Sequence, residues 1–149
     1  MKKLNLFIPM VLMAVMSAFT FVSCSDDDDK IDNGKIVGTW ESVLEEWWEK
    51  EDGKIVDEGT DDDTDLRVEF KADGTVTQYE YYNSSWHLDI TGNYSISGNK
   101  LTIVYDEDGD EYTSTQNIEM PDDNTLVVSG YWKEDNYEGY EKTTFRRIK

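Results

Sequence analysis

The side chains that most often carry out enzyme chemistry are scarce in this sequence. It contains one histidine, His87, and one cysteine, Cys24, among 149 residues. A catalytic triad or a histidine-rich metal site needs several such groups held within contact distance of one another. His87 falls on the polar side of a predicted strand, where an ordinary exposed histidine is the better interpretation. We therefore expect no enzyme activity, no cofactor and no metal centre.

Carboxylates are so abundant that their pairing carries little information. With 33 Asp and Glu residues, coincidental pairs suited to glycoside hydrolysis are inevitable. Asp106-Glu107-Asp108-Gly109-Asp110 is similar to a calcium loop. Its glycine, however, follows the second acidic ligand position, and no bidentate Glu stands at the required distance. An acidic hairpin turn with at most weak calcium binding is the expected structure.

Cys24 gains its meaning from the segment that precedes it. Lys2 and Lys3 are followed by a mostly apolar run over residues 4–23, which ends in small residues at the cysteine. This order is typical of a secretory signal peptide over residues 1–23. The alternative is a transmembrane anchor, because the run approaches the roughly 20 apolar residues that span a bilayer. Pro9 and the Ser23-Cys24 junction favour removal of the segment.

The junction Val22-Ser23-Cys24 resembles a bacterial lipobox, with Phe21 in the place where leucine is usual. The resemblance implies that Cys24 receives lipid after export. A lone cysteine can form no intramolecular disulfide, which agrees with its being modified. Several acyl chains on one cysteine would hold the protein durably on a membrane, whereas a single chain binds marginally. The membrane is thus an expected partner.

The residues after the cysteine form an acidic tract: Ser25, Asp26, Asp27, Asp28 and Asp29. So short a run of like charge does not fold, and a solvated spacer within a linker over residues 24–34 is one interpretation. The tract also resembles the address that sends some Gram-negative lipoproteins to the outer face of the outer membrane. We expect an outer-membrane anchor with the domain at the cell surface; the alternative is an anchor that faces the periplasm.

Composition limits the partners of the remaining chain. Residues 24–149 keep all 33 acidic residues and 12 of the 14 Lys and Arg, which gives a net charge of −21. Such a surface repels nucleic acid phosphates, so no nucleic acid partner is expected. Aromatic residues make up 13% of the chain, too many for a disordered acidic tail. These features predict one folded domain over residues 35–149, which we expect to be monomeric.

Short stretches of alternating apolar and polar residues recur after residue 30, with turn residues between them, while no helical period is sustained. Consecutive hairpins build a meander, and closure into a barrel removes its exposed edges. We therefore predict an all-β fold, an up-and-down antiparallel barrel of about eight strands. The candidate strands are residues 36–49, 54–57, 65–71, 75–83, 86–97, 100–105, 111–120, 125–132 and 141–148.

The first predicted strand carries Gly38-Thr39-Trp40, which resembles the Gly-x-Trp that opens the first strand of lipocalins. Residues 92–103 are also similar to a hairpin common in small bacterial lipocalin-like lipoproteins. The resemblance implies a lipocalin-like barrel in which Trp40 closes one end, stacked against an arginine from the last strand. Arg146 and Arg147 are the two candidates. A guanidinium over an indole stabilises by about 0.5 to 2 kcal/mol.

The barrel interior depends on one strand register. A two-residue turn at Asp73-Gly74 would give an aromatic interior, whereas a three-residue loop over residues 72–74 turns Val76 and a polar set inward. We favour the second, because Val76 then faces Phe70 and Gly74 takes the bulge position. The candidate cavity residues are Phe70, Gln78, Glu80, Trp86, Leu88, Ile90 and Tyr94.

Two functions follow from these expectations. In the first, an anchored lipocalin-like barrel binds a small, partly apolar or amphipathic ligand in its mouth. In the second, the barrel is filled by its own side chains, and outward aromatic residues such as Trp47, Trp48 and Tyr131 bind a protein or a glycan in adhesion or assembly. A cavity of about 300 Å³ or more would favour the first function.

Overall fold

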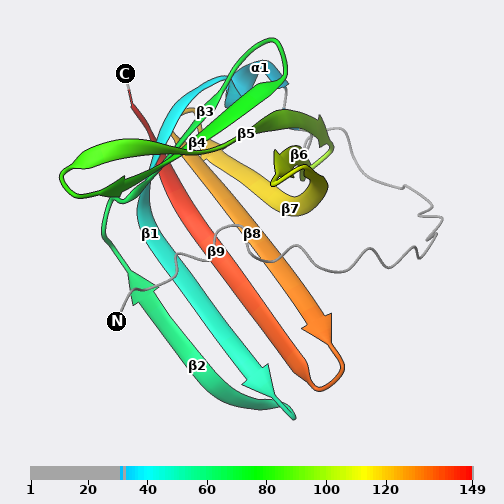
Figure 1. Cartoon of the computed structure of the whole chain (residues 1–149). Coiled ribbons are helices and arrows are strands. Elements are labelled where there is room, and N and C mark those ends of the chain that lie inside the picture. Colours follow the sequence, from blue (N-terminus) through cyan, green and yellow to red (C-terminus); the bar gives the residue numbers. More distant parts are fainter. Residues whose placement is uncertain (1–30, 32, 149) are drawn as a thin grey trace.

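Antiparallel strands make up nearly all of the described chain (Figure 1). The computed structural model describes residue 31 and residues 33–148; the signal segment, Cys24 and the acidic tract lie outside them. The elements are α1 (Asn33–Ile36), β1 (Gly38–Glu51), β2 (Lys54–Asp61), β3 (Leu66–Phe70), β4 (Thr75–Tyr82), β5 (Ser85–Ser97), β6 (Lys100–Glu107), β7 (Asp110–Asp122), β8 (Thr125–Glu134) and β9 (Tyr137–Ile148). Within the described residues, no helix is both long and apolar enough to span a bilayer.

The nine strands correspond to the nine predicted ones, and several are longer than predicted. β2, β8 and β9 extend by two to four residues into stretches rich in charge, where backbone pairing continues without an apolar pattern to announce it. The short helix α1, which the sequence pattern did not predict, ends with the buried Ile36.

Tight turns join most of the strands. Asp108 and Gly109, both at positive φ (53° and 91°), connect β6 to β7. Two consecutive positive φ values match the right-handed twist of the paired strands. The acidic run that is similar to a calcium loop is therefore a hairpin turn, as predicted.

Eight of the strands close into a barrel. β3 to β9 pair in chain order, β1 pairs with β3 through residues 38–41, and β1 also pairs with β9 along almost its whole length. Every strand pair is antiparallel, as predicted. Closure satisfies the backbone groups that an open meander would leave exposed at its two edges.

The ninth strand, β2, lies outside the closed ring. It pairs only with residues 45–51 of β1, the part of that strand beyond its pairing with β3. Residues 130–134 of β8 likewise continue past their last pairing with β7. The result is a four-stranded sheet, in the order β2-β1-β9-β8, which projects from the barrel (Figure 1). We call this part, formed by β2 and residues 45–51, 130–134 and 137–143, the sheet extension.

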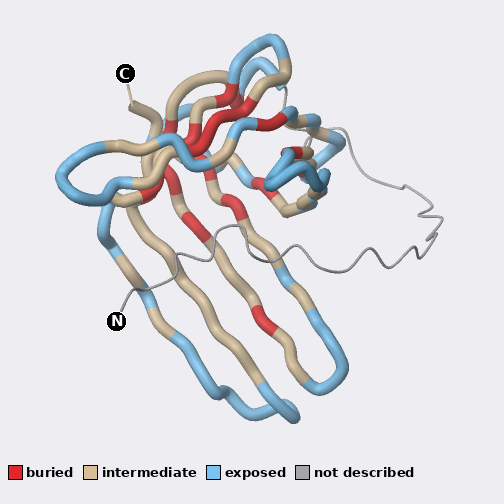
Figure 2. Tube along the Cα trace, in the orientation of Figure 1, coloured by how far each residue is buried: buried red, intermediate tan, exposed pale blue. Residues whose placement is uncertain are grey.

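Buried residues gather in the barrel and thin out along the sheet extension (Figure 2). The apolar core includes Trp40, Phe70, Leu101, Leu126 and Phe145, each at most 3% exposed. The alternation of inward and outward side chains continues from the barrel into the extension. We call the side that continues from Phe145 and Thr143 the inner face of the extension, and the opposite side its outer face.

Candidate functional site

One barrel end is closed by an arginine and a tryptophan. The Arg147 guanidinium lies 4.1 Å from the centre of the Trp40 ring. It also donates hydrogen bonds to the backbone carbonyls of Val37 (2.7 Å), Lys35 (2.5 Å) and Asp123 (2.8 Å). Trp40, which is fully buried, donates from Nε1 to the Ile36 carbonyl at 2.8 Å. Of the two candidate arginines, the structure places Arg147 on Trp40 and leaves Arg146 exposed.

Gly38 is required by the same contact. Its φ of +141° is unfavourable for residues with a Cβ, and a Cβ built there would lie 2.5 Å from an Arg147 guanidinium nitrogen. The absence of a side chain thus lets the guanidinium reach the Val37 carbonyl beside it. Gly38, Trp40 and Arg147 form a structural closure in which the Trp40 side chain is fully buried.

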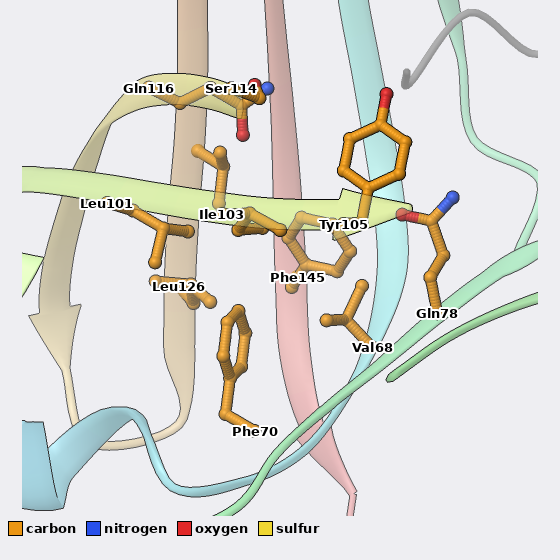
Figure 3. A pocket seen from close by; sticks show the side chains of 11 residues that line it. Val68, Phe70, Gln78, Leu101, Ile103, Tyr105, Ser114, Gln116, Leu126 and Phe145 are labelled. Carbon is orange, nitrogen blue, oxygen red and sulfur yellow. The ribbon is translucent and has the colours of Figure 1, made fainter. Parts of the chain in front are cut away.

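Side chains from several strands line a small pocket inside the barrel (Figure 3). Phe70, Leu101, Leu126 and Phe145 converge there, and Gln78, Ser114 and Gln116 add polar groups at its border. This pocket has a volume of about 20 Å³, which is room for about one water molecule. Burial raises the pKa of Tyr105, another lining residue, to about 12, so its hydroxyl stays protonated.

The register of β4 is the one that the sequence analysis favoured. Phe70 pairs with Val76 and Val68 with Gln78, while Gly74 takes a φ of +88°. Val76 and Gln78 are buried. Glu80 follows them beside Leu66, and burial together with the charges of Asp89 and Asp65 raises its pKa.

The prediction for the first half of β5 needs correction. Ile90 pairs with Gln78, but Leu88 pairs with the next residue, Tyr79. Asp89 is therefore an unpaired bulge residue, and the residues before it are turned to the other face of the strand. Leu88 is 65% exposed instead of lining a cavity.

Trp86 is displaced from the predicted cavity by the same bulge. Its ring packs outside, 4.2 Å from the Arg67 guanidinium carbon and 5.2 Å from the ring of Tyr81. After the bulge the predicted faces hold: Tyr94 packs edge-on against Phe70, with ring centres 5.0 Å apart. The Tyr94 hydroxyl donates to the Lys71 carbonyl at 2.8 Å, so this residue seals the barrel wall.

His87 lies half-buried near the β4–β5 turn. Its ring stacks on Tyr82 at 3.8 Å and shares a hydrogen bond of 2.8 Å with the Ser85 hydroxyl. The contacts of His87 with the described residues are thus a stacked ring and one hydroxyl group. This arrangement suits a structural histidine.

The outer face of the sheet extension carries three aromatic rings beside an open groove. Trp48 stacks on Tyr140 at 6.1 Å with 21° between the ring planes, and Tyr131 lies 6.3 Å from Trp48. We call these three rings the aromatic platform. Beside it lies a groove of about 480 Å³. Its lining residues are Glu46, Trp47, Trp48, Glu58, Gly59, Thr60, Tyr140 and Lys142.

Charged groups border this groove. Lys142 donates to Glu46 at 2.7 Å, and hydrogen bonding to that carboxylate raises the pKa of the lysine. On the other flank, the Lys50 ammonium lies 4.1 Å from the centre of the Trp48 ring. The groove therefore combines a flat aromatic wall with donors and acceptors whose positions are fixed by pairing across the strands.

Trp47 does not share the outer face with Trp48, although the sequence analysis grouped both as outward aromatics. Neighbouring residues of a strand point to opposite faces, and Trp47 lies over Gly59 on the inner face. Tyr140 and Lys142, two further members of the outer site, were not predicted from the sequence. One signal could have grouped the three rings: the alternation of side chains along β1, β9 and β8. Trp48 pairs with Tyr140, and Tyr140 pairs with Tyr131.

Comparison with known proteins places this architecture among described folds. Residues 36–128 match the family model of the lipocalin-like domain. A search of curated proteins finds no match to the chain.

Two solved structures from Bacteroides are similar to the chain. A lipocalin-like protein from Bacteroides uniformis shares 14% sequence identity at a TM-score of 0.52, over 77% of this chain and 100% of that one. An uncharacterized protein from Bacteroides eggerthii shares 18% identity at a TM-score of 0.49, over 75% of this chain and 98% of that one. At this identity the first likeness speaks for the fold alone.

Proposed function

The chain belongs to the lipocalin-like domain family, and from that premise we propose that it is a membrane-anchored glycan-binding module. In this proposal the binding surface is the outer face of the sheet extension, and the barrel serves as the support that holds it. The observation that carries the proposal is the groove of about 480 Å³ beside the aromatic platform.

The filled interior argues against a carrier of enclosed ligands. Pockets for small molecules usually measure about 300 to 1,000 Å³, whereas the pocket inside the barrel measures about 20 Å³. A small, partly apolar ligand in the barrel mouth, our first expectation from sequence, would have to displace core side chains such as Leu101 or Phe145. The alternative expectation, a filled barrel with binding on outward aromatic residues, agrees better with this interior.

The outer groove suits a sugar in size and chemistry. A pyranose ring presents an apolar face of C–H groups and a rim of hydroxyls. The rings of Trp48 and Tyr140 can receive the apolar face, because aromatic side chains bury large area with little conformational entropy. Glu46, Glu58, Thr60 and Lys142 then stand where hydroxyls need donors and acceptors.

Binding is tested with the full chain in detergent micelles on a glycan array, followed by calorimetry with the strongest oligosaccharide. We expect Trp48→Ala to weaken that binding at least tenfold, and Tyr82→Ala, an exposed aromatic of β4, to leave it unchanged. Absence of any glycan signal would overturn the proposal. Capture of a purified surface protein that depends on Trp48 would support the assembly function in its place.

Anchoring through Cys24 is the second part of the proposal. It is supported by the order of charged, apolar and small residues before Cys24 and by the acidic tract after it. Metabolic labelling with an alkyne fatty acid should mark the wild-type chain and leave Cys24→Ala unlabelled. Equal labelling of both chains would show that the lipid is elsewhere or that labelling is nonspecific.

Surface display is proposed to depend on the acidic tract. Replacement of Asp26, Asp27, Asp28 and Asp29 by alanine should reduce antibody labelling of intact cells while total protein in the membrane fraction stays the same. In a chain already so acidic, the tract adds little to the overall charge. Undiminished surface labelling would leave the tract with a spacer role.

A further inference from the structure

The groove beside the aromatic platform contains one carboxylate that no neighbouring group neutralises. Two glutamates line the groove, Glu46 and Glu58. Glu46 accepts a hydrogen bond from Lys142 and forms an ion pair with it at 2.7 Å. The Glu58 carboxylate has neither an ion pair nor a hydrogen bond within the described residues. Because Glu58 is exposed, its carboxylate is open to a ligand.

The strand register places this carboxylate beside the aromatic rings. Glu58 of β2 pairs with Trp48 of β1, and Trp48 pairs with Tyr140 of β9. Directly opposed residues of antiparallel strands share one face of the sheet, with Cβ atoms about 5 Å apart. The three residues therefore form one row across the outer face, and all three line the groove.

The other charged side chains of the outer face already have contacts. Lys133 lies 3.7 Å from the Glu138 carboxylate, and Lys50 lies against an indole of the platform. Hydrogen bonding to its glutamate partner raises the pKa of Lys142, so this lysine stays protonated in its ion pair. Among the described strands, no lysine of this face is left to pair with Glu58.

The charge of the groove favours some sugars over others. A carboxylate accepts hydrogen bonds and donates none, so Glu58 needs a donor. Hydrogen bonds from a charged donor are roughly twice as strong as those from a neutral one. The whole chain has a net charge of −19, which attracts cations and repels anions over longer distances. A sugar with an ammonium group would therefore gain most, and a sugar acid would be repelled.

We propose that the groove prefers amino sugars, binding glycans whose unacetylated amino group pairs with Glu58 while the pyranose ring packs against Trp48 and Tyr140. This inference rests on the proposed glycan-binding function and names the class of sugar that the groove selects. Packing on the rings contributes affinity that many sugars share. The contact between ammonium and carboxylate provides the discrimination.

An amino sugar uses features of the groove that a simple ammonium ion leaves unused. Its apolar ring face can cover the aromatic wall, and its ammonium group, next to Trp48, is also attracted by the indole. The Thr60 hydroxyl and the Lys142–Glu46 pair remain for the sugar hydroxyls. N-acetylation replaces the ammonium group by a neutral amide, so the groove should distinguish the acetylated sugar from the free amine.

The test compares three tetrasaccharides with the same β-1,4-linked backbone and different groups at C2. Cellotetraose carries hydroxyls, the glucosamine tetramer carries ammonium groups, and the N-acetylglucosamine tetramer carries amides. Each is titrated calorimetrically into the full chain in detergent at pH 6, in 150 mM sodium chloride, where the Debye length is about 8 Å. We expect the glucosamine tetramer to bind at 1:1 and at least tenfold more tightly than the other two. Tetragalacturonate should bind more weakly than cellotetraose.

Variants separate the Glu58 contact from general acidity. Glu58→Gln should reduce the preference for the glucosamine tetramer over cellotetraose at least fivefold. Glu51→Gln is the matched control, because Glu51 is an exposed glutamate on the inner face of the same extension and its substitution changes the net charge equally. It should leave the preference unchanged. Trp48→Ala should weaken binding of both sugars by a similar factor, and circular dichroism should show that each variant is folded.

The outcomes distinguish this inference from the function on which it rests. If cellotetraose binds in a way that depends on Trp48 and the amino form binds no better, glycan binding stands and the preference for amino sugars is wrong. Failure of the glucosamine tetramer to bind overturns the inference, and a silent glycan array overturns the proposed function as well. A loss of preference in Glu51→Gln as large as that in Glu58→Gln would show attraction by overall charge and would also overturn the inference.

Discussion

A single arginine joins the first and last parts of the folded chain. Arg147, at the end of β9, donates to carbonyls at positions 35, 37 and 123 and covers the ring of Trp40. These carbonyls belong to the segment before β1 and to the β7–β8 turn. The residue thus acts as a tie across the barrel end, and its effect should be seen in stability.

Arg147→Ala should lower the free energy of unfolding by about 2 to 3 kcal/mol, through lost charge-assisted hydrogen bonds and the lost contact with Trp40. Arg147→Lys should recover little of this, because one ammonium cannot reach three carbonyls and also stack. Arg146→Ala serves as the control. Urea denaturation measures all three, and a cost for Arg146→Ala as large as that for Arg147→Ala would contradict the assignment.

Glu45 and Glu141, two glutamates on the inner face of the sheet extension, should make the free energy of unfolding depend on pH. Their pKa values of about 7 lie above the ordinary 4.5. The stabilising contribution of the protonated groups is therefore complete below about pH 4.5 and is lost as pH rises through 7. We expect the unfolding temperature to rise when pH falls from 8 to 6.

Glu141→Gln should raise the unfolding temperature at pH 8 and flatten its dependence on pH. Glu138 is the matched control, because the Tyr131 hydroxyl donates to it and lowers its pKa. Glu138→Gln should leave the slope between pH 6 and 8 unchanged. A Glu141→Gln variant with the wild-type slope would show that other acids produce the effect.

At the scale of elements, the glycines of the extension have different tasks. Gly139 lies under Trp132, whereas Gly130 has open space above it. Both glycines lie on the same face of adjacent strands. Substitution by alanine at the two positions therefore differs mainly in which atoms the added methyl group contacts.

Gly139→Ala should lower the free energy of unfolding by about 1 to 3 kcal/mol, because the added methyl group must displace the indole. Gly130→Ala should stay within about 0.5 kcal/mol of the wild type. Chemical denaturation gives both values, and tryptophan fluorescence should change only for Gly139→Ala. Equal costs would indicate that backbone conformation, and not the ring contact, decides the outcome.

The strands also show which features of the fold could be predicted from the sequence. Alternation located all nine strands, and turn chemistry at Gly74 selected the correct register of β4. Alternation also misplaced Trp86 and Leu88, because a one-residue bulge at Asp89 leaves no mark in the apolar pattern. The closeness of Glu45 and Glu141 on the inner face was not predictable, since they are two of 33 acids and only pairing across strands brings them together.

At the scale of the whole molecule, repulsion among acids opposes a compact shape. The full chain has a net charge of −19, and its described ion pairs are few and mostly at the surface. Such pairs contribute about 0 to 1 kcal/mol each. Most of the charge is therefore uncompensated, and screening should matter more than any single pair.

The unfolding temperature should rise when sodium chloride is increased from 10 mM to 300 mM. Over that range the Debye length falls from about 30 Å to about 6 Å, which weakens repulsion between distant acids. Potassium chloride should act equally at equal ionic strength. A fall in unfolding temperature, or a difference between the two salts, would indicate that specific ion pairs or ion binding dominate.

The strands differ in how many neighbours they pair with, and this difference should affect how fast their amide hydrogens exchange. The closed ring protects its amides on both sides, whereas β2 pairs on one side only and lies on a single-layered sheet. Local opening needs the least free energy where few buried contacts are lost. The protein should therefore exchange its amide hydrogens in a graded order, β2 first, then the far ends of β8 and β9, and the ring last. The surface proposed to bind glycans would then lie on the part of the protein that opens locally, while the barrel remains folded.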